Sequence, residues 1–454
     1  MDPKRKVLLV NSPLFRDSNQ NYDENPIPPL GLAYIASNLK DAGISCTLVD
    51  TVYKKMGVQE ICEFFLKELP IFIGMNIFTT NMHLVKEIVE KCQIETTFII
   101  GGQAAKFLYK EIFGWNTMNK IIVIAGEADL LFSALVQDTS DKIYFSEELK
   151  NPPRKFYIVD AKSPYFPKYI SDLHLHREFL ENEPSHKYGY KEAFIIASRG
   201  CKYSCAFCAA AKNLNKDIPI RYRSAQSLKD EITQIKSLYN DNVNAVRVLD
   251  DLFLRDIGSI KLAEEIFNNS GLFWRSMAHI LSFKDIKVEM LCDLRKSGCC
   301  ELFIGVESGS EEILKKIHKF HDIIKIKETF RKIFEAGISV KAYFIYGFHK
   351  ETEDDMSKTF KLAQELKNTA ENYKVGFRAS SFKFRLYHGT KIYNDFLIEN
   401  NCNYIDIKIT PDNSLSEAAG RNLFNFTSGN YSAVDDDCLN RFVEKTNLLK
   451  TFNL

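Results

Sequence analysis

Short apolar runs alternate with amphipathic stretches through two long blocks of the sequence, and this alternation constrains the fold more than any other feature. The apolar runs are residues 7–10, 47–49, 71–75, 97–100 and 121–124 in the first block, and 193–197, 245–249, 273–276, 302–305, 339–344 and 377–382 in the second. Continuous apolar strands between helices are typical of parallel sheets that are buried on both faces. The sequence therefore predicts an α/β protein with two parallel sheets.

The two blocks predict different arrangements. The first, residues 1–140, predicts a doubly wound, Rossmann- or flavodoxin-like sheet. The six strand–helix units of the second, residues 191–390, predict a partial (β/α)6 barrel related to the eight-unit TIM barrel. Residues 141–190 contain several prolines and little periodicity, so an irregular connector is expected there. Residues 391–454 are expected to form a C-terminal cap over the open side of the barrel.

Three cysteines directly follow the first apolar run of the second block. Cys201, Cys205 and Cys208 have the spacing C-x3-C-x2-C. Closely spaced thiolates are the ligands of iron–sulfur clusters, which usually take four. Three ligands leave one iron of a [4Fe–4S] cluster open, and an open iron can bind a small molecule that then reacts.

The cysteines have two other interpretations, a structural zinc site and buried core thiols. A structural zinc site needs four Cys or His ligands in a tetrahedral array, but His176 and His186 lie upstream at no standard spacing, and no paired C-x2-C follows. Buried free thiols often act as small core hydrophobes. Three of them within eight residues of a Gly- and Lys-containing loop fit that interpretation poorly.

With Gly200 before the first cysteine and Phe207 before the last, the run resembles the motif of the radical S-adenosylmethionine (SAM) superfamily. The resemblance implies that the open iron binds SAM and that the reduced cluster cleaves it. The 5′-deoxyadenosyl radical so formed removes a hydrogen atom from the substrate, which makes the three cysteines catalytic. Because the cofactor carries the hard chemistry, the protein must bind, orient and exclude water.

Two further segments resemble SAM-binding motifs of the same superfamily. Residues 249–253, Leu-Asp-Asp-Leu-Phe, resemble an acidic pair near the SAM amine, although Asp is also a common helix N-cap. Residues 305–310, Gly-Val-Glu-Ser-Gly-Ser, resemble a Gly-x-Glu-Ser-Gly motif whose glutamate accepts hydrogen bonds from the ribose. The candidates for SAM binding are therefore Phe207, Asp250, Asp251, Glu307 and Ser308.

The first block resembles the cobalamin (B12)-binding domain that precedes the radical SAM core in one large branch of the superfamily. The matching stretches are residues 28–39, 42–44, 98–103 and 125–129. Ligands bind beyond the carboxyl ends of the strands in such sheets, so the candidate cobalamin rim is Thr79, Thr80, Gly101, Gly102, Gln103, Gly126 and Glu127. The glycines suit close approach of the backbone to a bulky ligand. No Asp-x-His-x-x-Gly offers a histidine to cobalt, so a domain that keeps the fold without cobalamin stays an alternative.

Polar residues near the ends of later barrel strands are candidates for substrate contacts: His279, Tyr343, Lys383, Arg385 and His388. The competing interpretation of the lysine and the arginine is surface charge. For a histidine it is a core side chain with its hydrogen bonds satisfied. Only those side chains that face the cavity can contact a substrate.

Composition limits the partners. The net charge of the 454 residues is +1, so neither nucleic acid nor an anionic membrane is expected as a partner. No run approaches the ~18 apolar residues of a transmembrane helix, and the N-terminal apolar stretch is too short for a signal peptide. Eleven scattered cysteines without a secretion signal predict reduced thiols in the cytoplasm.

The preferred functional interpretation is a radical SAM enzyme that abstracts hydrogen from a polar small molecule, possible classes being sugars and aminoglycosides, and dehydrates or otherwise modifies it. That preference depends on a resemblance in residues 387–390, Tyr-His-Gly-Thr, and on the missing cobalt-ligand histidine. The alternatives are a cobalamin-dependent C-methyltransferase and a non-catalytic, metal-stabilised binding protein. The resemblance also implies a reducing electron donor such as flavodoxin or ferredoxin.

Overall fold

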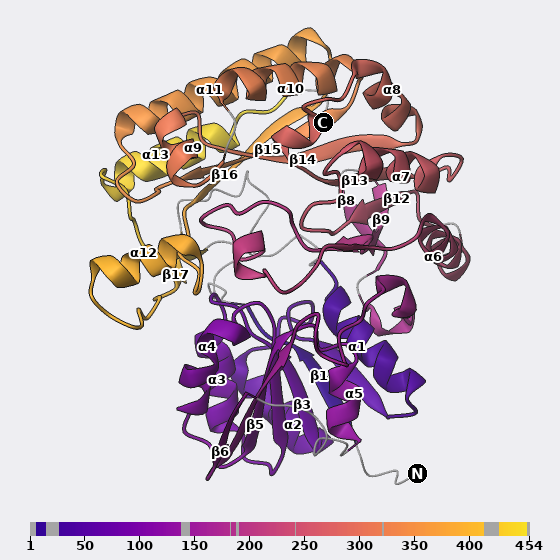
Figure 1. Ribbon diagram of the computed structural model, residues 1–454, viewed down its shortest axis with the longest axis vertical. Coiled ribbons are helices and arrows are strands. Elements are labelled where there is room, and N and C mark those ends of the chain that lie inside the picture. The colour runs from indigo at the N-terminus through magenta and orange to yellow at the C-terminus, as the bar shows by residue number, and fades with distance from the viewer. Residues whose placement is uncertain are drawn as a thin grey trace.

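The protein folds into two lobes that face one another (Figure 1). The structure is a computed structural model that describes residues 6–14, 27–137, 146–181, 183–187, 190–240, 242–319, 322–412 and 426–451. The N-terminal lobe, in indigo and purple, contains the first sheet, and the second sheet with its helices forms the other lobe. Both sheets that the sequence predicts are present, and the α/β class is confirmed.

The N-terminal lobe is a seven-stranded sheet with the strand order β2-β1-β3-β4-β5-β7-β6. Its strands are β1 (Val7–Asn11), β2 (Cys46–Asp50), β3 (Phe72–Asn76), β4 (Thr97–Gly101), β5 (Lys120–Gly126), β6 (Glu147–Lys150) and β7 (Pro153–Val159). All neighbouring strands are parallel except β6 and β7. Its helices are α1 (Leu30–Asp41), α2 (Val58–Glu68), α3 (Met82–Lys91), α4 (Ala105–Phe113) and α5 (Leu131–Val136).

Strand β1 shows why helices cover both faces of this sheet. Val7 and Leu9 lie in one core with α1 and α5, whereas Leu8 and Val10 lie in the other with α2, α3 and α4. All four side chains are buried, and each such burial stabilises the fold by about 1.5–3 kcal/mol. A charged residue at Leu8 would therefore face an apolar core without a partner and destabilise the whole lobe.

The segment expected as an irregular connector contains two strands, β6 and β7, that extend the first sheet. Strand β7 pairs in parallel with β5, and its Phe156, Tyr157 and Val159 are buried. The fully buried guanidinium of Arg154 donates hydrogen bonds to the carbonyl oxygens of Asn119 (2.7 Å) and Thr117 (2.8 Å). Prolines at the start of this strand and an arginine inside it hide its apolar pattern. The arginine can be buried only because a loop remote in sequence accepts its hydrogen bonds.

The second sheet has the order β16-β15-β14-β13-β12-β9-β8. Its strands are β8 (Ser185–Lys187), β9 (Tyr190–Ile195), β12 (Ala245–Val248), β13 (Phe273–Ala278), β14 (Cys299–Glu307), β15 (Ser339–Tyr346) and β16 (Phe377–Lys383). The six strands from β9 to β16 are parallel. Their helices are α6 (Ala225–Leu238), α7 (Ile257–Phe267), α8 (Val288–Lys296), α9 (Glu311–Lys316), α10 (Ile323–Glu335) and α11 (Glu353–Asn372). Six strand–helix units without a β16–β9 pairing in the described sheets form the expected partial barrel.

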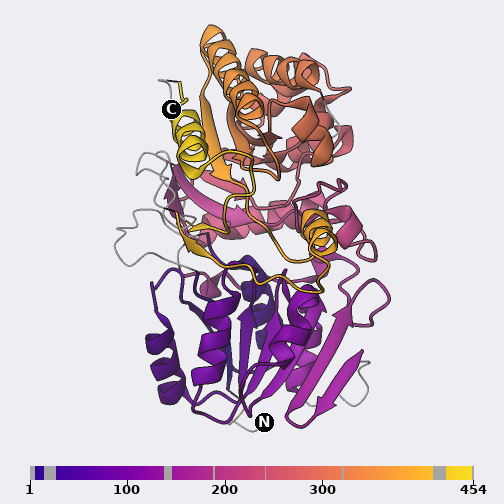
Figure 2. The same ribbon diagram turned by 90° about the vertical axis from the view of Figure 1, so that its left-hand side faces the viewer.

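The C-terminal helix α13 (Asp436–Asn447) lies along edge strand β16 (Figure 2). The amide of Asn447 accepts a hydrogen bond from the Ser381 backbone N–H at 2.7 Å. The ring of Phe442 stacks on Tyr346 with centroids 5.9 Å apart. A shorter helix that was not expected, α12 (Lys391–Glu399), precedes it. Helix α13 therefore covers the edge at which the barrel is open.

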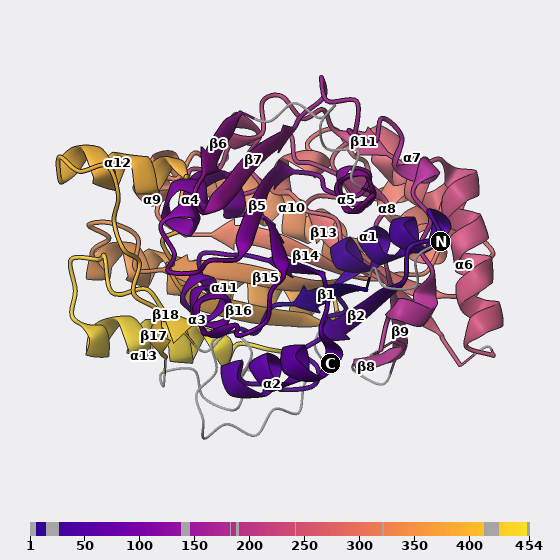
Figure 3. The same ribbon diagram turned by 90° about the horizontal axis from the view of Figure 1, so that it is seen from below.

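The carboxyl ends of both sheets meet between the lobes. Seen from below, the first sheet lies in front of strands β13 to β16 of the second (Figure 3). Arg199 from the barrel lobe forms an ion pair with Asp129, and His388 forms a hydrogen bond with Thr79. In the described part of the chain, no helix has the length and apolar character needed to cross a membrane.

Candidate active site

A single cavity of about 1240 Å³ lies between the two lobes, and we call it the shared cavity. Its wall includes the last residues of four N-terminal strands: Asn11, Asn76, Gly101 and Gly126. The opposite wall includes Cys208 and inward-facing residues of the barrel strands. Because ligands of α/β sheets bind beyond the carboxyl ends of the strands, both sheets offer their usual binding ends to one space.

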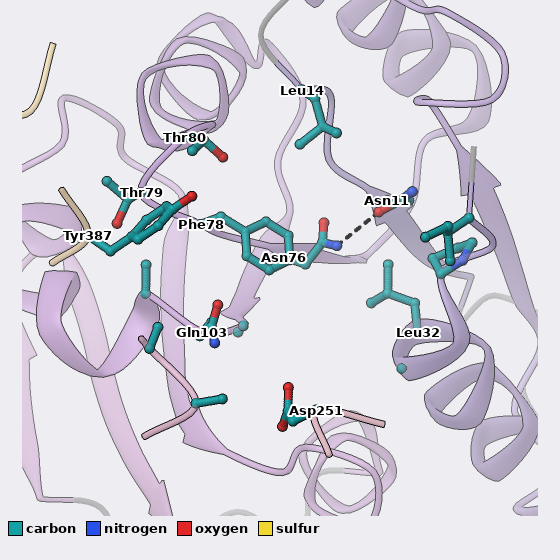
Figure 4. Close-up of a pocket in the computed structure, with 18 of the residues that line it drawn as sticks. Asn11, Leu14, Leu32, Asn76, Phe78, Thr79, Thr80, Gln103, Asp251 and Tyr387 are labelled. Atoms are coloured by element: carbon teal, nitrogen blue, oxygen red, sulfur yellow. Dashed lines mark hydrogen bonds between the residues drawn. The ribbon is translucent and has the colours of Figure 1, made fainter. Parts of the chain in front are cut away.

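All seven residues of the candidate cobalamin rim line the shared cavity: Thr79, Thr80, Gly101, Gly102, Gln103, Gly126 and Glu127. The amide of Gln103 points into it without a hydrogen-bond partner among the described residues (Figure 4). Beside it lie the ring of Phe78 and the side chains of Leu14 and Leu32, so much of this wall is apolar.

Asn11 and Asn76, which also line the cavity, are hydrogen-bonded to one another. The amide of Asn11 donates to Asp50 at 2.7 Å and accepts from the amide of Asn76 at 2.9 Å. Asn76 in turn accepts from the backbone N–H of Ser12 at 2.7 Å. This network holds the ends of β1, β2 and β3 together and leaves few groups free for a ligand.

Glu127 is bound by the other lobe. Its carboxylate forms ion pairs with Arg199 (2.9 Å) and with Arg221. The same Arg199 guanidinium binds Asp129 through two bonds of 2.8 and 3.0 Å and lies 5.5 Å from the ring of Tyr34. These side chains are largely buried, so the cluster fixes the position of one lobe relative to the other.

At two rim positions, glycine is required for a reason other than the expected close approach of a ligand. At Gly102, with φ +108°, an added Cβ would lie 2.8–2.9 Å from the backbone of Ile77. At Gly126, also with φ +108°, it would lie 2.1 Å from the carbonyl oxygen of Val159. Glycine is therefore required at both positions because any side chain would clash with the neighbouring backbone. Gly31 also lines the cavity beside this rim and has open space around it, since nothing lies within 4 Å of its added Cβ.

The three cysteines lie in the loop that follows β9. Cys205 is buried, and Cys201 and Cys208 are partly buried. Burial raises the pKa of all three thiols, that of Cys208 to about 12. Metal binding at this loop must therefore displace protons. Only Cys208 lies on the wall of the shared cavity, next to Phe207, whose ring packs 5.9 Å from that of Phe348.

The thiols of the cysteine loop lie close together and near a cation. They are close enough to raise one another's pKa values. Nearby Lys319 favours the thiolate form of Cys205, as ligation requires.

The two candidate aspartates differ. Asp250 is buried and accepts hydrogen bonds from the Ala197 backbone N–H (2.8 Å) and the Ser198 hydroxyl, so it holds the start of the cysteine loop. Burial raises its pKa to about 6. Asp251 points into the shared cavity (Figure 4) and has no hydrogen-bond partner in the described structure. Of the pair, Asp251 is the one available to a ligand.

Glu307 and Ser308 lie behind the cavity wall. Glu307, with φ +67°, forms an ion pair of 3.1 Å with the buried Lys319, which also donates to the carbonyl oxygen of Gly305. Ser308 is buried and lies 3.1 Å from the hydroxyl of Thr359. Neither residue lines the shared cavity. In this conformation the pair with Lys319 anchors the strand end below the cysteine loop.

Four of the five candidates for substrate contact line the cavity: Tyr343, Lys383, Arg385 and His388. Lys383 forms a buried ion pair with Asp412 at 2.8 Å. Arg385 stacks 4.0 Å above the ring of Phe426. His279 does not line the cavity; its ring stacks on Tyr203 of the cysteine loop with centroids 3.8 Å apart. It supports the loop from behind.

Several cavity residues were not predicted from the sequence, among them Arg247 and Lys341. Both lie inside barrel strands, β12 and β15, and face inward. A signal exists in the run Ala245-Val-Arg-Val248, because a charged residue within an otherwise buried strand is rare unless it is paired or functional.

Comparison with known families agrees with this geometry. Residues 195–363 match the radical SAM superfamily, and residues 22–136 match the B12-binding domain. The chain therefore contains a radical SAM domain preceded by a B12-binding domain. It is an enzyme, and the radical SAM domain implies a [4Fe–4S] cluster, SAM, a small-molecule substrate and a source of electrons. The non-catalytic alternative is excluded.

Individual relatives are distant. An uncharacterized methyltransferase of Pyrococcus horikoshii is 23% identical over 80% of this chain and 78% of that protein. The cytidylyl-2-hydroxyethylphosphonate methyltransferase of Streptomyces wedmorensis is 22% identical over 83% of this chain and 79% of its own.

Two solved structures share the fold. The cobalamin-dependent radical SAM enzyme OxsB, with aqua-cobalamin and SAM bound, has a TM-score of 0.64 at 16% identity and covers 98% of this chain, which spans 66% of OxsB. The methyltransferase TsrM of Kitasatospora setae, with cobalamin and cluster bound, has a TM-score of 0.60 at 16% identity, covering 87% of this chain and 75% of TsrM.

Proposed function

We propose that this enzyme transfers a methyl group from SAM, by way of cobalamin, to a carbon atom of a small molecule. The observation that carries the proposal is the shared cavity, which runs without interruption from the rim of the B12-type sheet to Cys208. Small-molecule pockets typically occupy ~300–1,000 Å³. A cavity of about 1240 Å³ has room for more than one ligand.

The names of relatives support methyl transfer over dehydration. Two distant relatives that match about four fifths of this chain are methyltransferases by name. The preference from sequence for dehydration of a sugar-like molecule rested on a short stretch of the late barrel and gains no support from them. Its alternative, the cobalamin-dependent methyltransferase, becomes the proposal.

In this proposal the cluster and SAM supply a 5′-deoxyadenosyl radical, and cobalamin carries the methyl group. Cys201, Cys205 and Cys208 hold the cluster. Asp251 has a free carboxylate on the cavity wall and accepts hydrogen bonds from the ammonium of SAM. Phe207, packed against a second ring, excludes water beside Cys208.

The B12-type rim presents a surface to the face of the corrin ring. Gly31 leaves open space there, and Phe78 and Leu32 supply apolar contact. Gln103 provides a free amide for a polar substituent of the ring. The sequence offers no histidine in the Asp-x-His-x-x-Gly context, so the rim contacts the corrin without a ligand of that motif. Flavodoxin or ferredoxin supplies the electron.

Cobalamin binding has a direct test in two matched tryptophan variants. Gly31 and Gly258 are both exposed and are both the second residue of a helix, α1 and α7. Gly31→Trp fills the rim and is expected to abolish the visible spectrum of bound corrinoid. Gly258→Trp lies away from the cavity and should bind cobalamin as the wild type does. Equal binding by both variants would place cobalamin elsewhere.

Methyl transfer itself is tested with SAM that carries a trideuterated methyl group. Reduced, cobalamin-loaded protein is incubated with a small-molecule extract, and the products are analysed by mass spectrometry. The proposal predicts a product that retains the labelled methyl group and is absent with Cys208→Ala. Products that form without label, together with 5′-deoxyadenosine, would instead establish a radical elimination or rearrangement.

A further inference from the structure

The barrel end of the shared cavity contains cations that no carboxylate neutralises. Arg247 on β12 and Lys341 on β15 both line the cavity. In the described structure neither side chain forms a hydrogen bond or an ion pair. Both instead lie near an aromatic ring: Arg247 is 4.9 Å and Lys341 5.9 Å from the centroid of Phe303.

The neighbouring charges are already paired. Arg275, 5.3 Å from the same Phe303 ring, binds Glu192 with its guanidinium fork and reaches Glu301 at 3.1 Å. Arg378 binds both oxygens of Glu301 at 2.7 Å. Burial raises the pKa of Glu301 to about 7, so it contributes at most one negative charge. Among the described side chains around this ring, Glu192 and Glu301 bind Arg275 and Arg378, so neither carboxylate forms an ion pair with Arg247 or Lys341.

An unpaired charge in a partly desolvated site is costly unless a ligand compensates it. Burial lowers the pKa of Arg247, which is the direction expected for a cation that lacks a counter-ion. A guanidinium fork and an ammonium on one wall suit the oxygen atoms of a carboxylate or a phosphoryl group. We propose that Arg247 and Lys341 bind an anionic group of the substrate at the barrel end of the shared cavity.

The position of Lys341 also indicates the shape of that substrate. Lys341, Tyr343 and Ile345 line the cavity at alternate positions of β15, which ends at Tyr346. At roughly 3.3 Å per residue, the backbone of Lys341 lies roughly 16 Å from the carboxyl end of the strand. Between them the ring of Tyr343 stacks near Phe382, with centroids 6.1 Å apart. The substrate is elongated, with its anionic group deep in the barrel and its reacting carbon toward Cys208.

This inference specifies the substrate of the proposed methyltransferase, but its test needs neither reductant nor cobalamin. The test is isothermal titration of the full-length, cluster-reconstituted protein with inorganic phosphate and, separately, with propionate in a low-salt buffer. Wild-type protein should bind at least one of them. Arg247→Met and Lys341→Met remove one charge-assisted bond each and should weaken binding by roughly tenfold or more. Lys284→Met, on an exposed residue away from the cavity, should bind as the wild type does.

Two further readouts separate the alternatives. Without anion, Arg247→Met should be as stable to heat as the wild type or more so, because an uncompensated charge is removed. SAM affinity, measured by equilibrium dialysis, should be unchanged in both variants. No binding of either probe, or variants that bind like the wild type, would overturn the proposal. A tenfold loss of SAM affinity would overturn it too, since the cations would then hold the carboxylate of the cofactor. If Arg247→Met fails to fold, the anion and SAM affinities of Lys341→Met are compared with those of the wild type in the same way.

Discussion

The two walls of the shared cavity treat their polar groups differently. On the N-terminal wall, Asn11 and Asn76 bond to one another, and Glu127 is held by two arginines of the opposite lobe. On the barrel wall, Asp251 and Arg247 have no hydrogen-bond partner among the described residues. A half-buried charged group without a partner, such as Arg247, costs roughly 1–3 kcal/mol. Such groups mark where a ligand completes the site, whereas satisfied groups mark where the chain holds itself together.

The largest expected effect concerns the barrel wall. Cys205→Ala removes one of three cluster ligands and should abolish both the bound iron and the formation of 5′-deoxyadenosine. Cys92→Ala is the matched control, because Cys92 lies at the end of α3 in the other lobe. Iron and sulfide analysis with a deoxyadenosine assay measures both. A Cys205→Ala protein that keeps its cluster would show that the loop is not the metal site.

The next effect tests the N-terminal wall as a structural element. Arg199→Met leaves the largely buried carboxylates of Glu127 and Asp129 with less compensation. Breaking a buried pair from one side typically costs about 3–5 kcal/mol, so the urea midpoint should fall strongly. Arg199→Lys keeps the charge and should recover part of the loss. An unchanged midpoint in Arg199→Met would mean that the lobes are held by other contacts.

A smaller effect follows from His388, which joins the walls through Thr79. Burial lowers the pKa of His388 to about 4 from its usual 6.5. Between pH 4 and 6.5, the imidazole is therefore protonated in the unfolded chain but neutral in the folded protein. This contribution to stability is complete above about pH 6.5 and is lost as the pH falls toward 4, by about 3 kcal/mol.

His388→Gln removes that titration. Its unfolding free energy, measured by urea at several pH values, should therefore fall by less than that of the wild type between pH 6.5 and 4.5. Identical slopes for the two proteins would show that the imidazole titrates normally and is not enclosed at the lobe interface.

The smallest effect concerns the free amide on the N-terminal wall. Gln103→Ala removes a single hydrogen bond to cobalamin, worth about 0.5–1.5 kcal/mol, so affinity should fall roughly two- to tenfold. Titration of the corrinoid spectrum measures it. Since the amide has no protein partner in the described structure, the melting temperature should not change. A drop in melting temperature with unchanged affinity would give Gln103 a structural role instead.

The elements with a simple period were predictable, and those defined by distant partners were not. Strand β1 was predictable because its first four residues, Val7–Val10, are all apolar and helices cover both faces. Strand β7 was missed because Arg154 interrupts its pattern, and only the carbonyl oxygens of a remote loop make that burial possible.

The same division holds at the site. The cysteine spacing is local, so the prediction that this loop binds a cluster requires no tertiary information. Which aspartate of the pair faces the cavity depends on whether Ala197 or a ligand donates a hydrogen bond to its carboxylate, and this is decided by the tertiary structure. The inward direction of Arg247 likewise depends on how the barrel strands curve together.

In the proposed function, cobalamin binds the N-terminal wall of the shared cavity, and the radical forms at the barrel wall. The most direct test measures bound corrinoid and reductant-dependent 5′-deoxyadenosine in Gly31→Trp and Cys208→Ala proteins, prepared anaerobically beside the wild type. The account predicts that Gly31→Trp loses corrinoid and still forms deoxyadenosine, while Cys208→Ala keeps corrinoid and forms none. A wild-type protein that binds no corrinoid, or a Gly31→Trp variant that binds it normally, would contradict the account.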